Sequence, residues 1–185
     1  MIEWAADPET ARASGRLALI YFFMKDRPVC RMMEEETFAD AEVARVVTES
    51  FAAVRLDIEA WPELFEKTIG GRGGLAVAVV DGEGDVVSAL NGYATPRVLL
   101  RMLEKSRKGY AALVAAKESG RPFELGETYR ELGSLRRAEE CYRKSLTGVQ
   151  AAPSHERLSR VRVLRGRIVE ARTHLEAARK LGVAG

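Results

Sequence analysis

Cysteine and histidine are scarce in this sequence, which excludes two common ways of stabilising or equipping a small protein. Its 185 residues contain two cysteines, Cys30 and Cys141, and two histidines, His155 and His174. Two cysteines cannot form the disulfide framework of a small secreted domain, and no Cys/His spacing matches a zinc site. We therefore expect no structural metal and no cofactor, and we expect both thiols to be reduced.

Long apolar runs and a large excess of one charge are also missing. The first apolar run, Leu17–Met24, is too short to span a membrane and lacks the basic flank and the cleavage site of a signal peptide. The net charge of +2 is too balanced for a dedicated nucleic-acid-binding protein. These absences predict a cytoplasmic protein that binds neither membranes nor nucleic acids.

The balanced total hides two halves of opposite charge. Residues 1–118 carry 15 basic and 19 acidic side chains, whereas residues 119–185 carry 14 basic and 8 acidic ones. The hydrophobic fraction of 46% and the charged fraction of 30% are ordinary for a globular protein. A chain of this length accommodates one ordinary domain and an appendage, and the change in charge predicts a boundary near residue 118.

The first 118 residues alternate between strand and helix patterns. Apolar runs predict buried strands at 17–23, 51–58, 75–80 and 86–90, and the last two flank the turn sequence Asp81–Asp85. Helices are predicted at 7–15, at 28–38, after Asp40, at 61–69, and from Pro96 to about residue 118. This order indicates an α/β fold in which helices sandwich a mixed sheet.

Beyond residue 118 the strand pattern disappears, and the chain is predicted to be helical to its end. Two segments match at an offset of 33 residues: Leu158, Gly166, Ala171, Leu175 and Ala178 repeat Leu125, Gly133, Ala138, Tyr142 and Ser145. The pattern resembles the tetratricopeptide repeat (TPR), in which small residues let two antiparallel helices approach. Two repeats are fewer than such an array needs for a continuous core. We therefore expect this tail to pack on the helix at 96–118 or to form a homo-oligomer.

A longer resemblance begins near the N-terminus. Tyr21-Phe22, followed by Cys30-Arg31-Met32-Met33-Glu34-Glu35-Glu36-Thr37-Phe38, resembles the thioredoxin-like family, whose members read Y-F-x-x-x-W-C-x-x-C-K-x-M-E-E-E-T-F. Later family motifs follow in order as Asp40-Ala41-Glu42-Val43, Val54–Asp57, Gly70–Leu75, Asp81–Gly84 and Gly92-Tyr93. The resemblance covers about residues 4–110. It implies a thioredoxin-like domain at 1–118, followed by an all-α, TPR-like tail of about two helix pairs at 119–185.

The residues of the family's redox centre do not match. Arg27 stands where the nucleophilic cysteine is expected and Asp26 replaces the tryptophan, so the motif reads R-P-V-C and Cys30 is the one thiol left in it. Dithiol exchange needs a second thiol to resolve the mixed disulfide. The family's cis-proline falls on Leu75, and because a cis bond before a non-proline residue costs about 3 kcal/mol, we expect a trans Gly74–Leu75 bond. The resemblance thus implies a protein that is not a competent dithiol-disulfide oxidoreductase.

Two interpretations of Cys30 stay open. It could act as a monothiol in glutathione-linked exchange or oxidant sensing, with Arg27 favouring the thiolate. Alternatively it is a small buried hydrophobe in the first turn of a helix, while Arg27 points into solvent or pairs with Asp26. Cys141 is expected to be structural. The partner-binding candidates of the degenerate motif are Arg27, Pro28, Cys30, Gly74 and Leu75.

Three further groups have a simple structural explanation. The glycine-rich loop at 70–74, with Arg72, lacks the Lys-Ser/Thr that follows a phosphate-binding loop. The glutamates at 34–36 occupy successive helix positions, which point apart, so a solvated face is expected. His155 and His174 have no partner whose spacing suggests a catalytic triad.

A basic group marks the tail: Arg157, Arg160, Arg162, Arg165 and Arg167. Apolar residues interleave with these arginines at helical spacing, and no aromatic residues accompany them, which argues against single-stranded nucleic acid. A solvated helix face is the first expectation. Recognition of an acidic protein segment is the second, with Arg157, Arg160 and Arg165 as candidate contacts. The sequence as a whole predicts a protein-binding adaptor, and the alternative is a monothiol redox protein that uses Cys30.

Overall fold

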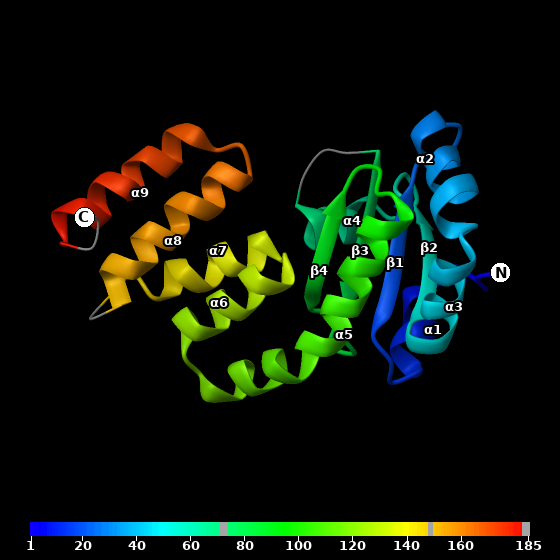
Figure 1. Ribbon diagram of the computed structural model, residues 1–185, viewed down its shortest axis with the longest axis horizontal. Helices are drawn as coiled ribbons and strands as arrows, with labels where there is room; N and C mark the ends of the chain where they lie inside the picture. The colour runs from blue at the N-terminus through cyan, green and yellow to red at the C-terminus, as the bar shows by residue number, and fades with distance from the viewer. Residues whose placement is uncertain (71–73, 148–149, 183–185) are drawn as a thin grey trace. The chain divides into compact units, whose positions relative to one another are not determined.

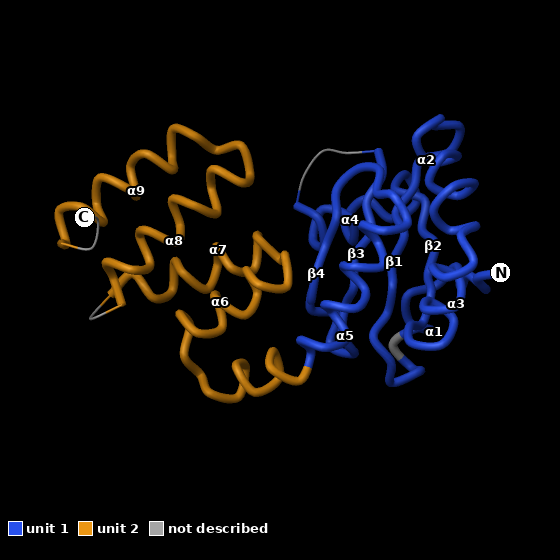
Figure 2. The backbone as a smooth tube through the Cα atoms, in the orientation of Figure 1, with its two compact units in different colours: residues 1–110 blue, residues 111–185 orange. Residues whose placement is uncertain are grey.

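The computed structural model describes residues 1–70, 74–147 and 150–182, with the backbone alone for Arg12. The chain divides into two compact units, residues 1–110 and 111–185 (Figure 2). The division falls inside one long helix, α5, which runs over Pro96–Ser119. The division therefore lies eight residues before the boundary that the charge pattern predicts after residue 118. The last turns of α5 belong to the helical unit.

The described part of the first unit contains a four-stranded sheet with the strand order β2-β1-β3-β4 (Figure 1). Strand β1 (Ala18–Phe23) pairs in parallel with β2 (Ala52–Asp57). Strand β3 (Leu75–Val80) runs antiparallel both to β1 and to β4 (Val86–Asn91), with which it forms the predicted hairpin. The prediction of a mixed sheet is confirmed.

Both faces of this sheet are covered. On one face, Ile20 and Phe22 belong to a buried apolar cluster with Ala11 of α1 (Pro8–Ala13) and Phe65 of α4 (Pro62–Ile69). Because side chains alternate along a strand, Leu19 and Tyr21 point to the other face, and they too are fully buried. Burial on both faces explains why β1 reads as one continuous apolar run.

The segment after β1 departs from the single helix predicted at 28–38. It begins as α2 (Pro28–Met32) and continues as a π-helix, η1 (Met33–Phe38). The wider turn places Thr37 inside the protein, where its hydroxyl donates a hydrogen bond of 2.7 Å to the carbonyl of Ala94. The next helix, α3 (Ala41–Ser50), begins where the predicted N-cap Asp40 accepts the backbone amides of its first turn.

The second unit holds two helix pairs in its described part. They are α6 (Pro122–Leu132) with α7 (Leu135–Lys144), and α8 (Ala151–Leu164) with α9 (Ile168–Lys180). Gly133 and Gly166 follow the first helix of each pair with φ angles of 89° and 73°, a conformation that glycine adopts without strain. The repeat offset of 33 residues therefore marks the same turn in both pairs. Among the described helices, none is long and apolar enough to cross a membrane.

The two helix pairs differ at their crossing. A Cβ atom added to Gly126 of α6 would lie 2.7 Å from Cε1 of Tyr142 on α7, so this position excludes a side chain. At the offset of 33 residues the corresponding positions are Ser159 and Leu175. The exchange is compensated, because leucine is smaller than tyrosine and leaves room for a serine side chain.

Candidate functional site

The R-P-V-C motif lies at the junction of β1 and α2, with Arg27 just before the helix and residues 28–30 in its first turn. Arg27 is the N-cap of α2 and is exposed, Pro28 occupies the first turn, and Asp26 adopts a left-handed φ of 61°, which aspartate tolerates better than most residues. The exposure of Arg27 fits the expectation that its guanidinium points into solvent. The loop keeps the geometry of a helix entrance but presents a cation where the resemblance placed a thiol.

Cys30 is turned into the protein. The residue is 3% exposed, and its thiol donates a hydrogen bond of 3.2 Å to the carbonyl of Gly74. This contact engages the sulfur inside the fold, whereas disulfide exchange needs an accessible thiolate. The expectation of a small buried residue in the first turn of the helix is confirmed. Cys141, on α7, is buried as expected for a structural residue.

Gly74 and Leu75 form the other side of this site. The structure contains no cis peptide bond among its described residues, so the Gly74–Leu75 bond is trans, as predicted. Leu75 is 2% exposed, begins β3 and accepts the amide of Gly92 at 2.9 Å. Because the Gly74 carbonyl already receives the Cys30 thiol, this backbone is engaged within the fold. Of the glycine-rich loop, Arg72 and its two neighbours lie outside the described residues.

A series of hydrogen bonds connects the helix that carries Cys30 to strands β1 and β2. The Tyr21 hydroxyl donates to the carbonyl of Cys30 and to Glu34, at 3.3 Å each, and Arg55 of β2 donates to Glu34 at 2.7 Å. Burial, the Cys30 thiol and the Glu34 carboxylate raise the pKa of Tyr21. These groups border a hollow of about 370 Å³ that Trp4 and Phe38 also line.

Glu34 corrects one sequence expectation. The solvated face predicted for the glutamates at 34–36 is wrong for this residue, which is half-buried and paired with Arg55. A signal was present in the sequence, because Arg55 interrupts an apolar strand and a partly buried cation needs a partner. Nothing in the local spacing, however, places Glu34 beside a residue 21 positions away.

The arginines of the tail also differ from the sequence expectation. Arg157 pairs with Glu127 of α6 at 2.8 Å, and Arg162 pairs with Glu139 of α7 at 3.2 Å. Arg165 contacts Glu139 as well. A solvated face is therefore wrong for these three residues. Of the three candidate contacts for an acidic segment, Arg157 and Arg165 are bound internally, and Arg160 is exposed beside Glu156.

Glu139 is the centre of the larger ion-pair group. Its side chain is 2% exposed, and its carboxylate meets four guanidinium groups, those of Arg143, Arg162, Arg165 and Arg167. Burial opposes ionisation, but the arginines outweigh it and hold the pKa of Glu139 below its usual value. This buried carboxylate connects α7 to α8 and to the start of α9.

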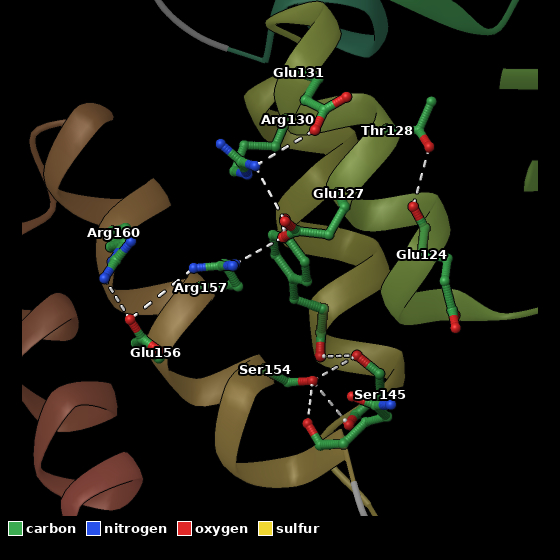
Figure 3. A network of polar contacts seen from close by, with 12 residues as sticks. Glu124, Glu127, Thr128, Arg130, Glu131, Ser145, Ser154, Glu156, Arg157 and Arg160 are labelled. Carbon is green, nitrogen blue, oxygen red and sulfur yellow. Dashed lines mark hydrogen bonds and ion pairs between the residues drawn. The ribbon is translucent and has the colours of Figure 1, made fainter. Parts of the chain in front are cut away.

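A second group connects α6, α7 and α8 (Figure 3). Glu127 accepts hydrogen bonds from Tyr142 at 2.5 Å, from Arg157 at 2.8 Å and from Arg130 at 3.0 Å. Burial raises the pKa of Tyr142, and its hydrogen bond to Glu127 raises it further. These contacts join three helices inside the unit, so they fix the helix packing and leave little capacity for a ligand.

The two histidines lie together, although 19 positions separate them in the chain. The Nδ1 atoms of His155 on α8 and His174 on α9 are 2.7 Å apart, so one ring donates to the other. Burial lowers the pKa of His174 to about 4, and Arg162, His155 and Arg143 lower it further than Glu139 raises it. His174 is accordingly neutral at pH 7, and the two rings form a packing contact between α8 and α9.

One acidic group could be mistaken for a metal site. In the part of the chain that the structure describes, Asp81, Glu83 and Asp85 bring carboxylate oxygens within 4.8 Å of one another. Asp81 Oδ1, however, accepts the backbone amides of Glu83 and Asp85, at 3.0 and 2.8 Å. These contacts explain the cluster as the stabilised turn of the β3–β4 hairpin.

Comparison with known proteins agrees with this geometry. The model of the thioredoxin-like domain family matches residues 4–107, more than half of the chain. The protein therefore belongs to the thioredoxin-like domain family, as the motifs of the first unit predict. A search of curated proteins finds no match to the chain.

Solved structures are also similar to this chain. A structure described as DsbH oxidoreductase aligns with a TM-score of 0.50 and 13% identity, over 58% of this chain and 85% of its own. A thioredoxin from Thermus thermophilus has 23% identity and a TM-score of 0.49, over 56% and 85%. The DsbD C-terminal domain of Neisseria meningitidis has 21% identity and a TM-score of 0.45, over 56% and 99%. At these identities the likeness concerns the fold alone.

Proposed function

We propose that this protein is a thioredoxin-like binding module without dithiol activity, whose helical tail contacts other proteins. The observation that carries the proposal is the position of the Cys30 thiol, which is buried and donates a hydrogen bond to the Gly74 carbonyl. In addition, Arg27 occupies the first position of the motif. In dithiol exchange one thiolate attacks a disulfide and a second thiol releases the mixed disulfide. Here the attacking position carries a guanidinium, and the remaining sulfur faces inward.

The tail supports the second half of this proposal. We take its two helix pairs to be TPR-like, because the glycines of the 33-residue offset, Gly133 and Gly166, lie at equivalent turns. Helix pairs of this kind expose long surfaces that suit protein partners. In this proposal the protein acts in the cytoplasm. Pairing of two copies through the tail stays a further prediction, and sedimentation of the full chain at several concentrations tests it.

The redox half is tested by disulfide reduction. We expect the unmodified protein to show no turnover of insulin disulfides in the presence of dithiothreitol above the rate of the reagent alone. Arg27→Cys restores two thiols with the family spacing, and Arg27→Ser is the matched control that adds no sulfur. Turnover by the unmodified protein, or fast alkylation of Cys30 in the folded state, would contradict the proposal and favour the monothiol alternative.

A further inference from the structure

The two helix pairs of the tail have very different charge balances. Residues 122–144, which span α6 and α7, carry five basic and five acidic side chains. Residues 151–180, which span α8 and α9, carry eight basic and three acidic ones. The excess positive charge of the second unit therefore comes from its second helix pair.

Much of this excess gathers where α8 meets α9. Four guanidinium groups, those of Arg143, Arg162, Arg165 and Arg167, contact Glu139, and Glu170 is the second carboxylate that pairs with Arg162 and Arg167. Four cations thus face two anions. Arg143 and Arg167 remain 48% and 42% exposed, so their guanidiniums are accessible from solvent.

Two other features indicate that the potential here is positive. Burial is the first cause of the low pKa of His174. Arg162 and Arg143 lower it further, and they outweigh the opposite influence of Glu139. Helix α9 also begins at this point, and its N-cap residue Arg167 makes no side-chain capping bond. The positive end of the helix dipole therefore adds to the arginines.

Apolar side chains are exposed at the same place. Val163 and Leu164 at the end of α8 are 50% and 68% exposed, and Ile168 and Val169 at the start of α9 are 62% and 84% exposed. We name residues 162–169 the α8–α9 corner. Four exposed aliphatic side chains within seven consecutive residues form an exposed apolar patch, which is typical of a protein-interaction site.

We propose that the α8–α9 corner binds an acidic segment of another protein that also carries apolar side chains. The inference rests on the proposed function, for which it names the site and the chemistry of the partner. Guanidinium groups suit carboxylates because their planar donors match two oxygens, and Arg143 and Arg167 are the exposed members of the group that could donate to a partner. The aliphatic side chains supply the desolvated contact that such a pairing needs for affinity.

Other partners fit this surface less well. Residues 151–185 contain no phenylalanine, tyrosine or tryptophan, so the stacking platform for single-stranded nucleic acid is missing. A membrane surface would need an apolar stripe along α9, but beyond Val169 its exposed face carries Arg172, Thr173 and Glu176. The apolar patch is confined to the corner, which suits a narrow segment of chain.

The test uses the full-length protein and a fluorescent synthetic peptide that alternates glutamate with leucine. We expect saturable binding in fluorescence anisotropy that weakens as salt is added, because part of the attraction is between exposed charges. Leu164→Ser combined with Ile168→Ser should weaken binding at least about tenfold. Arg167→Gln should weaken it about two- to fivefold.

Matched controls separate this site from general effects. Val98→Ser removes an aliphatic side chain of similar exposure from α5, and Arg179→Gln removes a cation from the far end of α9; both should bind normally. Equal binding of a glutamate–serine peptide, equal losses in the controls, or binding of phosphatidylserine vesicles in place of the peptide would overturn the proposal. Disulfide turnover by the unmodified protein would refute the proposed lack of redox activity, but it would not change the peptide-binding result. Failure of the proposed function can therefore be distinguished from failure of the proposed binding site.

Discussion

The two units differ in whether their reactive or charged side chains are satisfied by contacts within the fold. In the first unit, the thiol of Cys30 is buried and its proton is donated to the Gly74 carbonyl. In the second unit, the arginines around Glu139 outnumber the carboxylates they meet. A group whose bonding capacity is met inside the fold has little left for a ligand, whereas unbalanced charge at a surface attracts one. This comparison supports our proposal that the protein binds its partners through the tail, even though the family motif lies in the other unit.

The largest effect is expected from removing the carboxylate at the centre of the tail. Glu139→Gln leaves the inward-facing guanidiniums without their counter-ion and should lower the free energy of unfolding of the helical unit by about 3 kcal/mol or more. Thermal unfolding followed by circular dichroism measures the loss. Glu140→Gln is the control, because Glu140 is partly exposed and pairs with Arg136 and Arg137 of its own helix. A similar loss in both variants would contradict the central role of Glu139.

A smaller effect is expected where α6 crosses α7. Gly126→Ala forces a Cβ into the Tyr142 ring and should cost about 1–3 kcal/mol, whereas Gly82→Ala, which meets nothing within 4 Å, should be nearly neutral. Gly126→Ser combined with Tyr142→Leu copies the second helix pair. We expect the double variant to be more stable than the sum of the two single changes predicts. Simple additivity in chemical denaturation would show that the two crossings are built differently.

The pH dependence of the tail provides a further comparison. The pKa of His174 is about 4 in the folded protein, against about 6.5 in an unfolded chain, so the unfolded chain binds more protons between these values. Stability should be highest above about pH 6.5 and should fall as the pH decreases towards 4. The pKa difference alone corresponds to about 3 kcal/mol, and because the ring is partly exposed to solvent we expect a loss of about 1–2 kcal/mol. His174→Gln should make the free energy of unfolding nearly independent of pH between these two pH values, and chemical denaturation at several pH values measures this. An unchanged slope would assign the loss to other groups.

The smallest effects are expected at the degenerate motif. Cys30→Ala removes the sulfur and leaves the Gly74 carbonyl without its donor, which should cost about 1 kcal/mol. Arg27→Ala changes an exposed side chain and should alter stability by less than about 0.5 kcal/mol. Urea denaturation of both variants measures the difference. A larger cost for Arg27→Ala would mean that the guanidinium has a structural contact.

Local signals predicted the order of the elements well. Pro28, Pro62, Pro96 and Pro122 each begin a helix, and the apolar runs became the four described strands. The π-helix at Met33–Phe38 was not predictable, because it depends on placing Thr37 against Ala94, a residue 57 positions away. The inward arginines of the tail were missed for the same reason. Helical spacing shows which residues share a face, but it does not show which distant carboxylate that face meets.

The sequence by itself determined the family, the pattern of strands and helices, and the loss of the dithiol pair, because each depends on residues close together in the chain. Tertiary structure decided that Cys30 points to Gly74 and that Glu34 pairs with Arg55. It also decided that Arg157 and Arg165 pair with glutamates of other helices, whereas the exposed Arg160 pairs with Glu156 of its own helix. The contacts of Cys30, Glu34, Arg157 and Arg165 span 21 to 44 residues. Burial makes an unpaired charge costly, so the packing of distant helices selects which charges are neutralised and which remain available.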